Sequence, residues 1–314
     1  MLSRVADSVY WMGRYLERSE NITRLLLVTE DFSTETQGLA EQVAHSAWKD
    51  LLAIFPSAQV APPSALAPMS QTYLTSFFLD PANPYSVHYS VRKARENARS
   101  VREALTVEAF LAINETFRAL EGYARRGLSD LPALRDALGA THKGLFATSG
   151  AIEHTFTRDE SWLFLKLGES LERAYRTALV LRAKLPALGA AEPRADVALY
   201  YTQWRTLLRA LGSLENYRRA YGARLEPDLV VQFLLYDPHS PRSLRYTTEV
   251  VKEHLQRLTG ESGPALRLVG RLHAELSYHD GSAPPGGDQA AFLDRVVDVM
   301  SVAHDALSTQ YFAT

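Results

Sequence analysis

The sequence of 314 residues contains no cysteine. Disulfides, zinc–thiolate sites, iron–sulfur clusters and cysteine nucleophiles are therefore excluded. No stretch reaches the roughly 18 consecutive apolar residues that a membrane span needs. The first residues show no basic segment followed by an apolar run, so we expect a cytoplasmic protein without a membrane partner. The formal net charge is only −2, which gives no indication of a nucleic-acid partner.

The sequence also lacks the short motifs of common catalytic and nucleotide sites. It contains no G-x-x-x-x-G-K-[ST], no G-x-G-x-x-G and no G-x-S-x-G. Its histidines have no i, i+4 partners, so we expect no metal site and no cofactor. Asp294 and Asp298 are spaced like half of the paired aspartate motif of helical prenyl-transferring enzymes. No second acidic motif completes the pair, which favours an ordinary surface helix.

Three motifs occur twice, in the same order and at nearly the same spacing. Their patterns are G-x-x-L-E-R, W-x-x-L-L and D-P-x-x-P-x-S-[VL]-[HR]-Y. The copies begin at Gly13 and Gly168, at Trp48 and Trp204, and at Asp80 and Asp237. This recurrence predicts a tandem duplication, with a first helical pseudo-repeat at residues 1–156 and a second at residues 157–314. We expect the two to be related by an approximate twofold and to form one compact structural unit.

Helical periodicity runs through the chain, and no alternating pattern predicts a strand, so an all-α helical bundle is expected. The predicted helices are Ser3 to Glu30, Thr34 to Phe55, Tyr85 to Leu105, Val107 to Arg126, Leu131 to Thr155, Asp159 to Lys184, Arg194 to Tyr221, Arg242 to Leu258, Ala265 to Tyr278 and Gln289 to Phe312. Proline- and glycine-rich stretches predict loops at Pro56 to Pro68, Leu185 to Pro193 and Gly281 to Asp288. Pro84 is expected in a first helical turn.

The G-x-x-L-E-R motifs carry the main candidate ligand-binding residues. At about 100° per residue, the first predicted helix places its charged and amide groups on one side and its apolar residues on the other. The polar side holds Arg14, Glu17, Arg18, Asn21 and Arg24.

In the second copy of this motif, Glu172 shares its angular sector with apolar side chains. We expect it to be buried, where a carboxylate needs a partner. Arg176 lies one helical turn after Glu172. Arg18 or Arg14 of the first copy could also reach Glu172 across the repeat interface. Two interpretations stay open. Glu17, Arg18, Glu172 and Arg173 form a charged clamp between related helices, or they line a polar pocket for a carboxylate- or phosphate-bearing ligand.

The helix after the first turn motif carries a second group of candidate ligand-binding residues: Arg95, Glu96, Asn97 and Arg99. Arg95, Arg99 and Arg102 follow an i, i+4, i+7 spacing, which places them on one face. This face is either a solvated surface with local ion pairs or an anion site. Arg242 could add to such a site from the second turn motif. Its repeat mate is Tyr85, so that contribution would belong to one half only.

These motifs together resemble the bacterial alpha-E domain family, named for its helical fold and Glu-Arg motif. The resemblance covers essentially the whole chain. It rests on Leu2 to Arg18, Asn83-Pro84, Ala94 to Arg99, Leu167-Gly168 with Glu172-Arg173, and Pro241 to Ser243. Glu169-Ser170 departs from the pattern, because an arginine and an aromatic are expected there, as in Arg14-Tyr15. A strictly symmetric site is therefore not expected.

The resemblance implies particular partners. Members of this family are typically encoded beside, or fused to, an ATP-grasp ligase of the circularly permuted type. A transglutaminase-like peptidase often accompanies them, and sometimes a proteasome-like subunit. This setting implies peptide bond formation or peptide tagging.

We therefore expect a helical accessory protein that binds an ATP-grasp ligase, or its amino-acid or peptide substrate, through its arginine and glutamate groups. One alternative is an enzyme acting on an amino acid or peptide, with Glu17 or Glu172 as the general base and Arg14, Arg18 or Arg173 holding a carboxylate. A second alternative is a purely structural subunit of a homo-oligomer.

Overall fold

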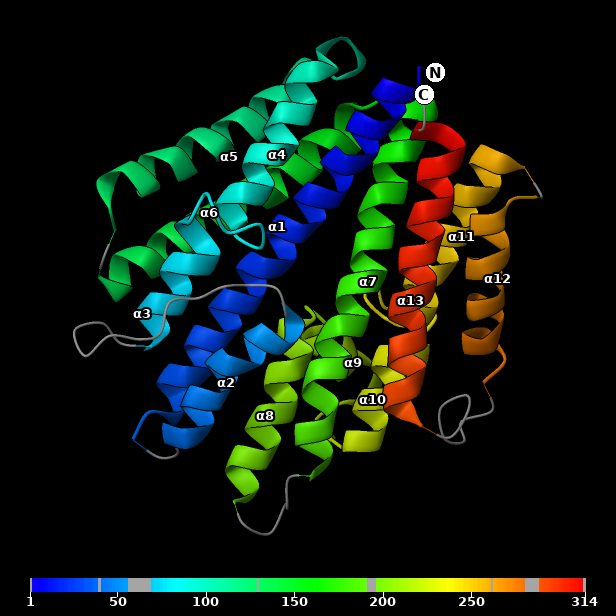
Figure 1. Ribbon diagram of the computed structural model, residues 1–314. Helices are drawn as coiled ribbons and strands as arrows, with labels where there is room; N and C mark the ends of the chain where they lie inside the picture. Colours follow the sequence, from blue (N-terminus) through cyan, green and yellow to red (C-terminus); the bar gives the residue numbers. More distant parts are fainter. Residues whose placement is uncertain are drawn as a thin grey trace. The chain divides into compact units, whose positions relative to one another are not determined.

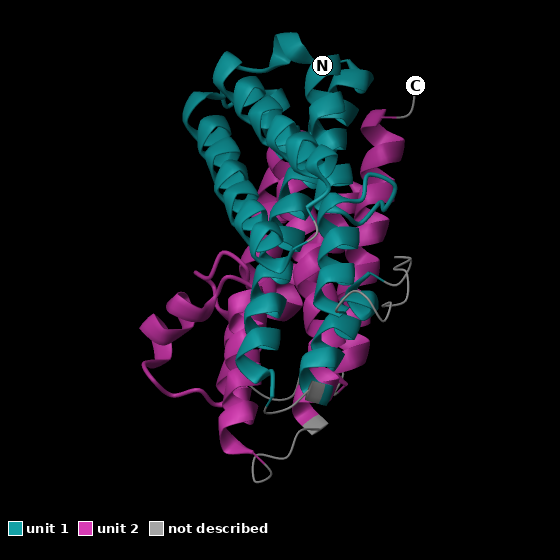
Figure 2. Ribbon diagram, turned by 90° about the vertical axis from the view of Figure 1, so that its left-hand side faces the viewer, with its two compact units in different colours: residues 1–165 teal, residues 166–314 magenta. Residues whose placement is uncertain are grey.

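The computed structural model describes residues 2–38, 41–55, 69–128, 130–190, 196–260, 262–279 and 288–312. Within these ranges every regular element is a helix, which confirms the predicted all-α fold class (Figure 1). The structure divides into two compact units, Met1–Leu165 and Lys166–Thr314 (Figure 2). The predicted repeat boundary at residue 156 stays a prediction, because compactness does not test duplication. Among the described helices, none combines the length and the apolar composition that a membrane span requires.

The first unit consists of helices joined by turns. In chain order its elements are α1 (Ser3–Thr36), α2 (Glu41–Ile54), α3 (Met69–Leu74), the π-helical turn η1 (Thr75–Leu79), α4 (Val87–Ser100), the 3-10 turn η2 (Arg102–Ala104), α5 (Val107–Arg126) and α6 (Leu131–Thr155). Helix α7 (Glu160–Ala190) begins in this unit and continues into the second. The predicted loop from Pro56 to Pro68 lies outside the described residues.

Helix α1 is longer than the polarity pattern predicts. It runs past Glu30 to Thr36, so the predicted start of a second helix at Thr34 is wrong. No proline or glycine interrupts the sequence between Gly13 and Gly38. Gly38 has a φ of +81°, a left-handed conformation that typically ends a helix. Backbone geometry at this glycine therefore sets the end of α1.

Helices α1 and α4 pack against each other and run in opposite directions. The ring centroids of Tyr15 and Tyr89 lie 6.5 Å apart, and Ser100 Oγ lies 3.2 Å from Ser8 Oγ. The start of α1 therefore meets the end of α4. Helix α4 also packs on α5, and α5 packs on α6, beside which it runs in Figure 1. Helix α1 therefore packs against a layer of helices.

The second unit continues from α7 with a further set of helices. Its elements are α8 (Val197–Ala210), α9 (Leu214–Tyr221), α10 (Pro227–Tyr236), α11 (Leu244–Thr259), α12 (Pro264–Ser277), α13 (Gln289–Leu307) and the π-helical turn η3 (Ser308–Phe312). Helix α12 packs on both α11 and α13. Arg182 of α7 donates a hydrogen bond to Asp294 of α13 at 2.9 Å, and Arg295 of α13 donates one to Glu275 of α12 at 2.6 Å.

Two predicted boundaries in the second unit are wrong. The helix predicted from Arg194 to Tyr221 is divided into α8 and α9, because Gly212 between them has a φ of +61°. Helix α7 continues to Ala190 and includes Pro186, although a linker was predicted from Leu185 onwards. The remainder of that linker, residues 191–193, lies outside the described residues, as do residues 281–287 of the last predicted loop.

The two D-P-x-x-P-x-S turns contain the same hydrogen bonds. Ser86 Oγ donates to the carbonyl oxygen of Asp80 at 2.6 Å and accepts the backbone N–H three residues on at 2.9 Å. Ser243 Oγ donates to the carbonyl oxygen of Asp237 and accepts the corresponding N–H at 3.0 Å. Each serine therefore caps the helix that follows, α4 or α11.

The prolines of these motifs lie in the turns themselves. The N–H of Ser86 donates to the carbonyl oxygen of Asn83 at 2.9 Å, which closes a turn with Pro84 as its second residue. The predicted place of Pro84 in the first helical turn is therefore wrong, because α4 begins only after Ser86. Pro241 occupies the same place in the second turn, which is closed between residues 240 and 243.

We expect Ser86→Ala to lower the free energy of unfolding by about 1–2 kcal/mol, because the cap of α4 and the tie to Asp80 are lost together. Chemical denaturation measures the change. Ser46→Ala on the exposed face of α2 is the control and should change stability by less than about 0.5 kcal/mol. Equal effects of the two substitutions would show that the turn hydrogen bonds do not stabilise the fold.

Candidate functional site

Helix α1 buries a row of charged and amide side chains. Their positions follow an i, i+3, i+7, i+10 spacing, which places them on one helical face. Each is less than a tenth exposed. We call this set the polar row: Arg14, Glu17, Asn21 and Arg24. The guanidinium of Arg14 lies 5.0 Å from the ring centroid of Trp11, and its Nη1 lies 3.5 Å from the hydroxyl of Tyr10. Arg18 is less buried and lies over the ring of Tyr15 at 5.2 Å.

Asn21 is the most buried member of the polar row, with 1% of its surface exposed. Neither its amide nitrogen nor its amide oxygen has a hydrogen-bond partner among the described residues. A buried polar group left in this state costs about 1–3 kcal/mol. Helix α1 therefore carries both a donor and an acceptor that the described part of the chain does not use.

Arg24, at the end of the polar row, belongs to a cluster that the sequence did not indicate. It forms an ion pair with Glu20 one turn earlier on α1. Glu20 also lies 3.2 Å from Nε2 of His142 on α6. The ring of His142 lies beside that of Phe146, with centroids 4.7 Å apart and planes tilted by 52°. Sequence spacing indicates the Glu20–Arg24 pair, but nothing in it connects α1 to His142. Within the described residues, no cluster of three or more His, Asp or Glu side chains is placed to hold a metal ion.

Helix α7 carries the second Glu-Arg motif, and here the prediction of a buried ion pair is confirmed. Glu172 is fully buried, and Arg176 donates to it from Nε at 2.8 Å. One turn earlier, Glu169 accepts hydrogen bonds from Lys166 and Arg173, each at 2.7 Å. Burial alone would raise the pKa of Glu169, but the two cations outweigh it and lower that pKa below its usual range. Around this motif the carboxylates are already paired with cations of their own helix.

His254 of α11 lies in the electrostatic environment of this α7 cluster. Burial lowers the pKa of the imidazole to about 4, and the positive charges of Lys166 and Arg257 add to the effect, while Glu169 opposes it. His254 is therefore neutral at physiological pH. The sequence aligns it with Asn97 of the first half, which is a neutral side chain at every pH.

The α4 candidates do not form one anion site. Arg95 turns towards α5, where its Nε donates to Asn114 at 2.7 Å and its guanidinium lies 4.4 Å from the ring centroid of Phe117. Burial lowers the pKa of Arg95, and nearby Arg99 lowers it further. Glu96 is exposed and is paired with Lys93 and Arg92 of its own helix. Asn97 is half-buried and Arg99 is exposed. Most of this face is a solvated surface with local ion pairs.

Two further arginines lie apart from these groups. Arg102 does not share a helical face with Arg95 and Arg99, because α4 ends at Ser100. The predicted three-arginine face is therefore wrong, and Arg102 instead lies over the ring of Phe110 at 4.5 Å. Arg242 is half-buried in the second turn, directly before the capping serine.

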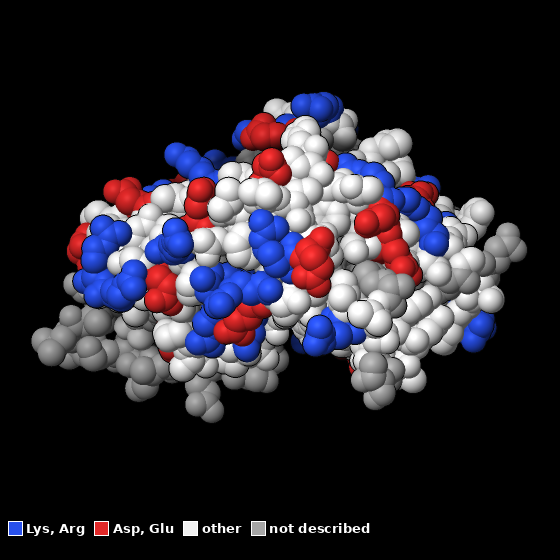
Figure 3. Space-filling model, turned by 90° about the horizontal axis from the view of Figure 1, so that it is seen from above, with Lys and Arg blue, Asp and Glu red and all other residues white. Residues whose placement is uncertain are grey.

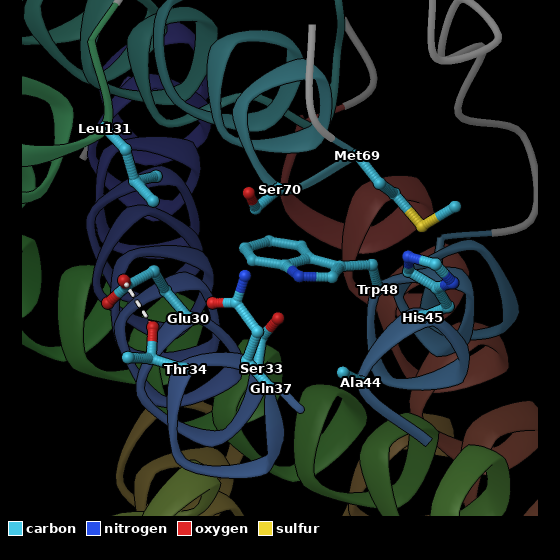
Figure 4. A pocket seen from close by; sticks show the side chains of 10 residues that line it. All are labelled: Glu30, Ser33, Thr34, Gln37, Ala44, His45, Trp48, Met69, Ser70 and Leu131. Atoms are coloured by element: carbon cyan, nitrogen blue, oxygen red, sulfur yellow. Dashed lines mark hydrogen bonds between the residues drawn. The ribbon is translucent and has the colours of Figure 1, made fainter. Parts of the chain in front are cut away.

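A pocket of about 130 Å³ opens in the first unit between the end of α1, α2, the start of α3 and the start of α6 (Figure 4). The indole of Trp48 lies across its middle, with Glu30 and Thr34 on one side and His45 and Met69 on the other. Trp48 is 1% exposed, and its indole N–H has no hydrogen-bond partner among the described residues. The W-x-x-L-L repeat singled out this tryptophan, but the pocket depends on helices that are distant in sequence.

The face of the molecule in Figure 3 carries no extended patch of one charge. Lysine and arginine side chains occur there in small groups, with aspartate and glutamate side chains among or beside them. This pattern agrees with the nearly balanced net charge of −2. An electrostatic footprint for nucleic acid, which needs a basic patch or stripe, is not found on this face.

An all-helical fold in which two long helices each carry a Glu-Arg motif with a buried glutamate defines the class to which this protein belongs. The chain is a member of the Alpha-E family, described as a predicted alpha-helical domain with a conserved ER motif, and the family model matches residues 1–312. The glutamate–arginine pairs at Glu17-Arg18 and Glu172-Arg173 have the ER sequence.

Mycobacterial proteins are similar to this chain over most of its length. An uncharacterized protein of Mycobacterium bovis is 29% identical over 291 residues, which is 87% of this chain and 32% of that protein. An uncharacterized protein of Mycobacterium tuberculosis strain H37Rv is 28% identical over 291 residues, with the same coverage. The chain thus spans about a third of the length of these relatives. No solved structure matches it significantly.

Proposed function

We propose that this protein is a helical accessory protein that works with an ATP-grasp ligase in peptide synthesis or tagging, and that the polar row of α1 binds the substrate. Asn21 carries this proposal. Its amide is buried, and neither of its polar atoms has a hydrogen-bond partner among the described residues. Natural proteins seldom leave a buried amide in this state without a structural or functional reason.

The chemistry of the polar row suits the end of an amino acid or peptide. The guanidinium of Arg14 has the geometry to bind a carboxylate or phosphate through two parallel hydrogen bonds. Glu17 can accept from an ammonium or amide N–H. Asn21, one turn beyond Glu17, offers a donor and an acceptor to the same ligand.

The lengths of the relatives support a role beside another protein or domain. In the mycobacterial relatives the matched segment makes up about a third of the chain, so it is joined there to a larger portion of other sequence. Resemblance to the alpha-E family suggests an ATP-grasp ligase as the partner, with a transglutaminase-like protein in the same system. In this proposal, residues 1–156 and 157–314 are tandem pseudo-repeats, which the matching hydrogen bonds of the two turns support.

Asn21→Leu tests the role of the polar row. We expect it to raise the free energy of unfolding by about 1–3 kcal/mol, because an unsatisfied buried amide is replaced by an apolar group of similar size. The same substitution should reduce binding of the peptide substrate and the stimulation of ligase output at least about tenfold. Denaturation measures the change in stability, and a ligation assay that mixes this protein with an ATP-grasp ligase measures the change in output.

Asn114→Leu is the matched control for this experiment. It makes the same change at another buried asparagine, whose amide oxygen already accepts from Arg95. It should lower stability, because Arg95 loses its acceptor, and leave ligase output unchanged. If the wild-type protein neither binds the ligase or its substrate nor changes ligase output, the proposal fails. If Asn21→Leu changes neither substrate binding nor ligase output, the polar row is not the binding site.

A further inference from the structure

The Trp48 pocket is separate from the polar row and has features of a small binding site. Its lining comes from α1, α2, α3 and α6, all within the first unit. Trp48 is almost fully buried. Its indole N–H can only donate a hydrogen bond, and it has no acceptor among the described residues. Figure 4 shows the nitrogen-bearing edge of the ring on the side of Ser33 and Gln37. A ligand in this pocket would therefore need to present an acceptor to Trp48.

The size of the pocket limits the ligand to a small group. A water molecule occupies about 30 Å³ in the liquid, so the volume of about 130 Å³ corresponds to roughly four water-sized groups. Pockets for complete drug-sized ligands are several times larger, from about 300 Å³ upwards. The pocket therefore suits one functional group with a short carbon chain.

The pocket does not favour a negatively charged ligand. Glu30, its acidic lining residue, forms an ion pair with Arg135 of α6, which also pairs with Asp31, and Glu30 accepts a hydrogen bond from Thr34 Oγ1 at 3.1 Å. Two carboxylates therefore share this one guanidinium. An anionic ligand would lose its hydration and meet a net negative charge, which disfavours it relative to a neutral polar group.

The remaining hydrogen-bonding groups are of both kinds. Trp48 offers a donor, Glu30 offers acceptor lone pairs, and the hydroxyl of Ser70 offers either. A primary amide matches this set, because it has a carbonyl acceptor and an NH₂ donor in one plane. Gln37 also lines the pocket, and in Figure 4 its amide points towards the indole.

We infer that the Trp48 pocket binds a primary amide, and that its physiological occupant is a glutamine or asparagine side chain of a peptide or protein. The carbonyl oxygen accepts from the indole N–H, and the NH₂ group donates towards Glu30. Propionamide reproduces the end of a glutamine side chain and is the probe for this inference. Propionate has nearly the same shape but is charged, so it is the matched control ligand.

The test uses ¹⁵N-labelled protein and follows the indole N–H resonances during titration. The chain has 4 tryptophans, and the spectrum of Trp48→Phe identifies the Trp48 resonance. We expect propionamide to shift that resonance along a saturating curve, with affinity in the millimolar range for a ligand of this size. Propionate at the same concentrations should produce a shift at least about tenfold smaller.

Trp204 provides an internal control. It occupies the position aligned with Trp48, is 3% exposed, and its indole N–H also lacks a partner among the described residues. Its resonance should not move, and Trp204→Phe should retain propionamide binding, whereas Trp48→Phe should weaken it at least about tenfold. Equal shifts at both tryptophans, a response that does not saturate, or equal effects of propionate and propionamide would each overturn the inference. This titration does not use the ligase assay, so its result can be told apart from the result of the Asn21→Leu experiment.

A peptide arm distinguishes a side chain from a free small amide. An unstructured peptide with one glutamine should shift the Trp48 resonance at lower concentration than propionamide does, because flanking residues add contacts. The same peptide with glutamate in place of glutamine should not shift it. If the glutamine peptide binds no better than propionamide, the occupant is a free small amide and the assignment to a peptide side chain is wrong.

Discussion

Replacing Arg176 by methionine is expected to lower the free energy of unfolding by about 3–5 kcal/mol. Arg176 donates to Glu172 at 2.8 Å, and the two side chains are only 4% and 0% exposed. Methionine fills a similar space, but it removes the charge-assisted hydrogen bond that Arg176 donates to the buried carboxylate of Glu172. Urea-induced unfolding, followed by the helical circular dichroism signal, measures the loss.

An exposed pair in the same unit is the control for this effect. Arg218 and Glu215 are paired at 3.0 Å but are 52% and 77% exposed, so Arg218→Met should cost less than about 1 kcal/mol. The double substitution Glu172→Gln with Arg176→Met should recover much of the loss, because neither charge of the pair remains. If Arg176→Met costs no more than Arg218→Met, the hydrogen bond of Arg176 to Glu172 does not stabilise the fold.

Acidification from pH 6.5 to pH 4 is expected to remove about 3 kcal/mol of stability through His254 alone. The unfolded imidazole takes up a proton near its ordinary pKa of 6.5, whereas burial lowers the pKa in the folded protein to about 4. Between these values the unfolded state binds more protons than the folded state. The contribution of His254 is therefore complete above pH 6.5 and is lost as the pH falls through this window.

His254→Asn should flatten this part of the pH profile, since asparagine does not titrate and is the residue at the aligned position of the first half. Denaturation at several pH values between 4 and 7 measures the slope. His239→Asn, at an exposed position of the second unit, should leave the slope as in the wild type. The attribution of this slope to His254 would be contradicted if the wild-type profile lacked the slope, or if His254→Asn left it unchanged.

Features that depend on one helix could be predicted from the sequence. The burial of Glu172 follows from the apolar sector around the glutamate and is confirmed. The i, i+4 spacing makes Arg176 one of its candidate partners, and the two side chains are hydrogen-bonded. The polarity of α1 likewise indicated a face that includes Asn21. In these cases helical geometry alone brings the residues together, so no knowledge of the tertiary fold was needed.

Features that depend on distant segments could not be predicted. The contact between Glu20 and His142 joins α1 to α6, and the Trp48 pocket is formed by α1, α2, α3 and α6. Single-sequence periodicity does not determine which helices pack together. The end of α1 was also misplaced, because the left-handed backbone of Gly38 decides it and the polarity pattern changes several residues earlier.

The two serine-capped turns have a consequence for how the chain folds. Each hydroxyl ties together residues only six positions apart in sequence, Asp80 with Ser86 and Asp237 with Ser243. Closing so short a loop costs little chain entropy, so these contacts do not need distant helices to be in place. Each turn can therefore close and cap α4 or α11 without contacts from distant helices.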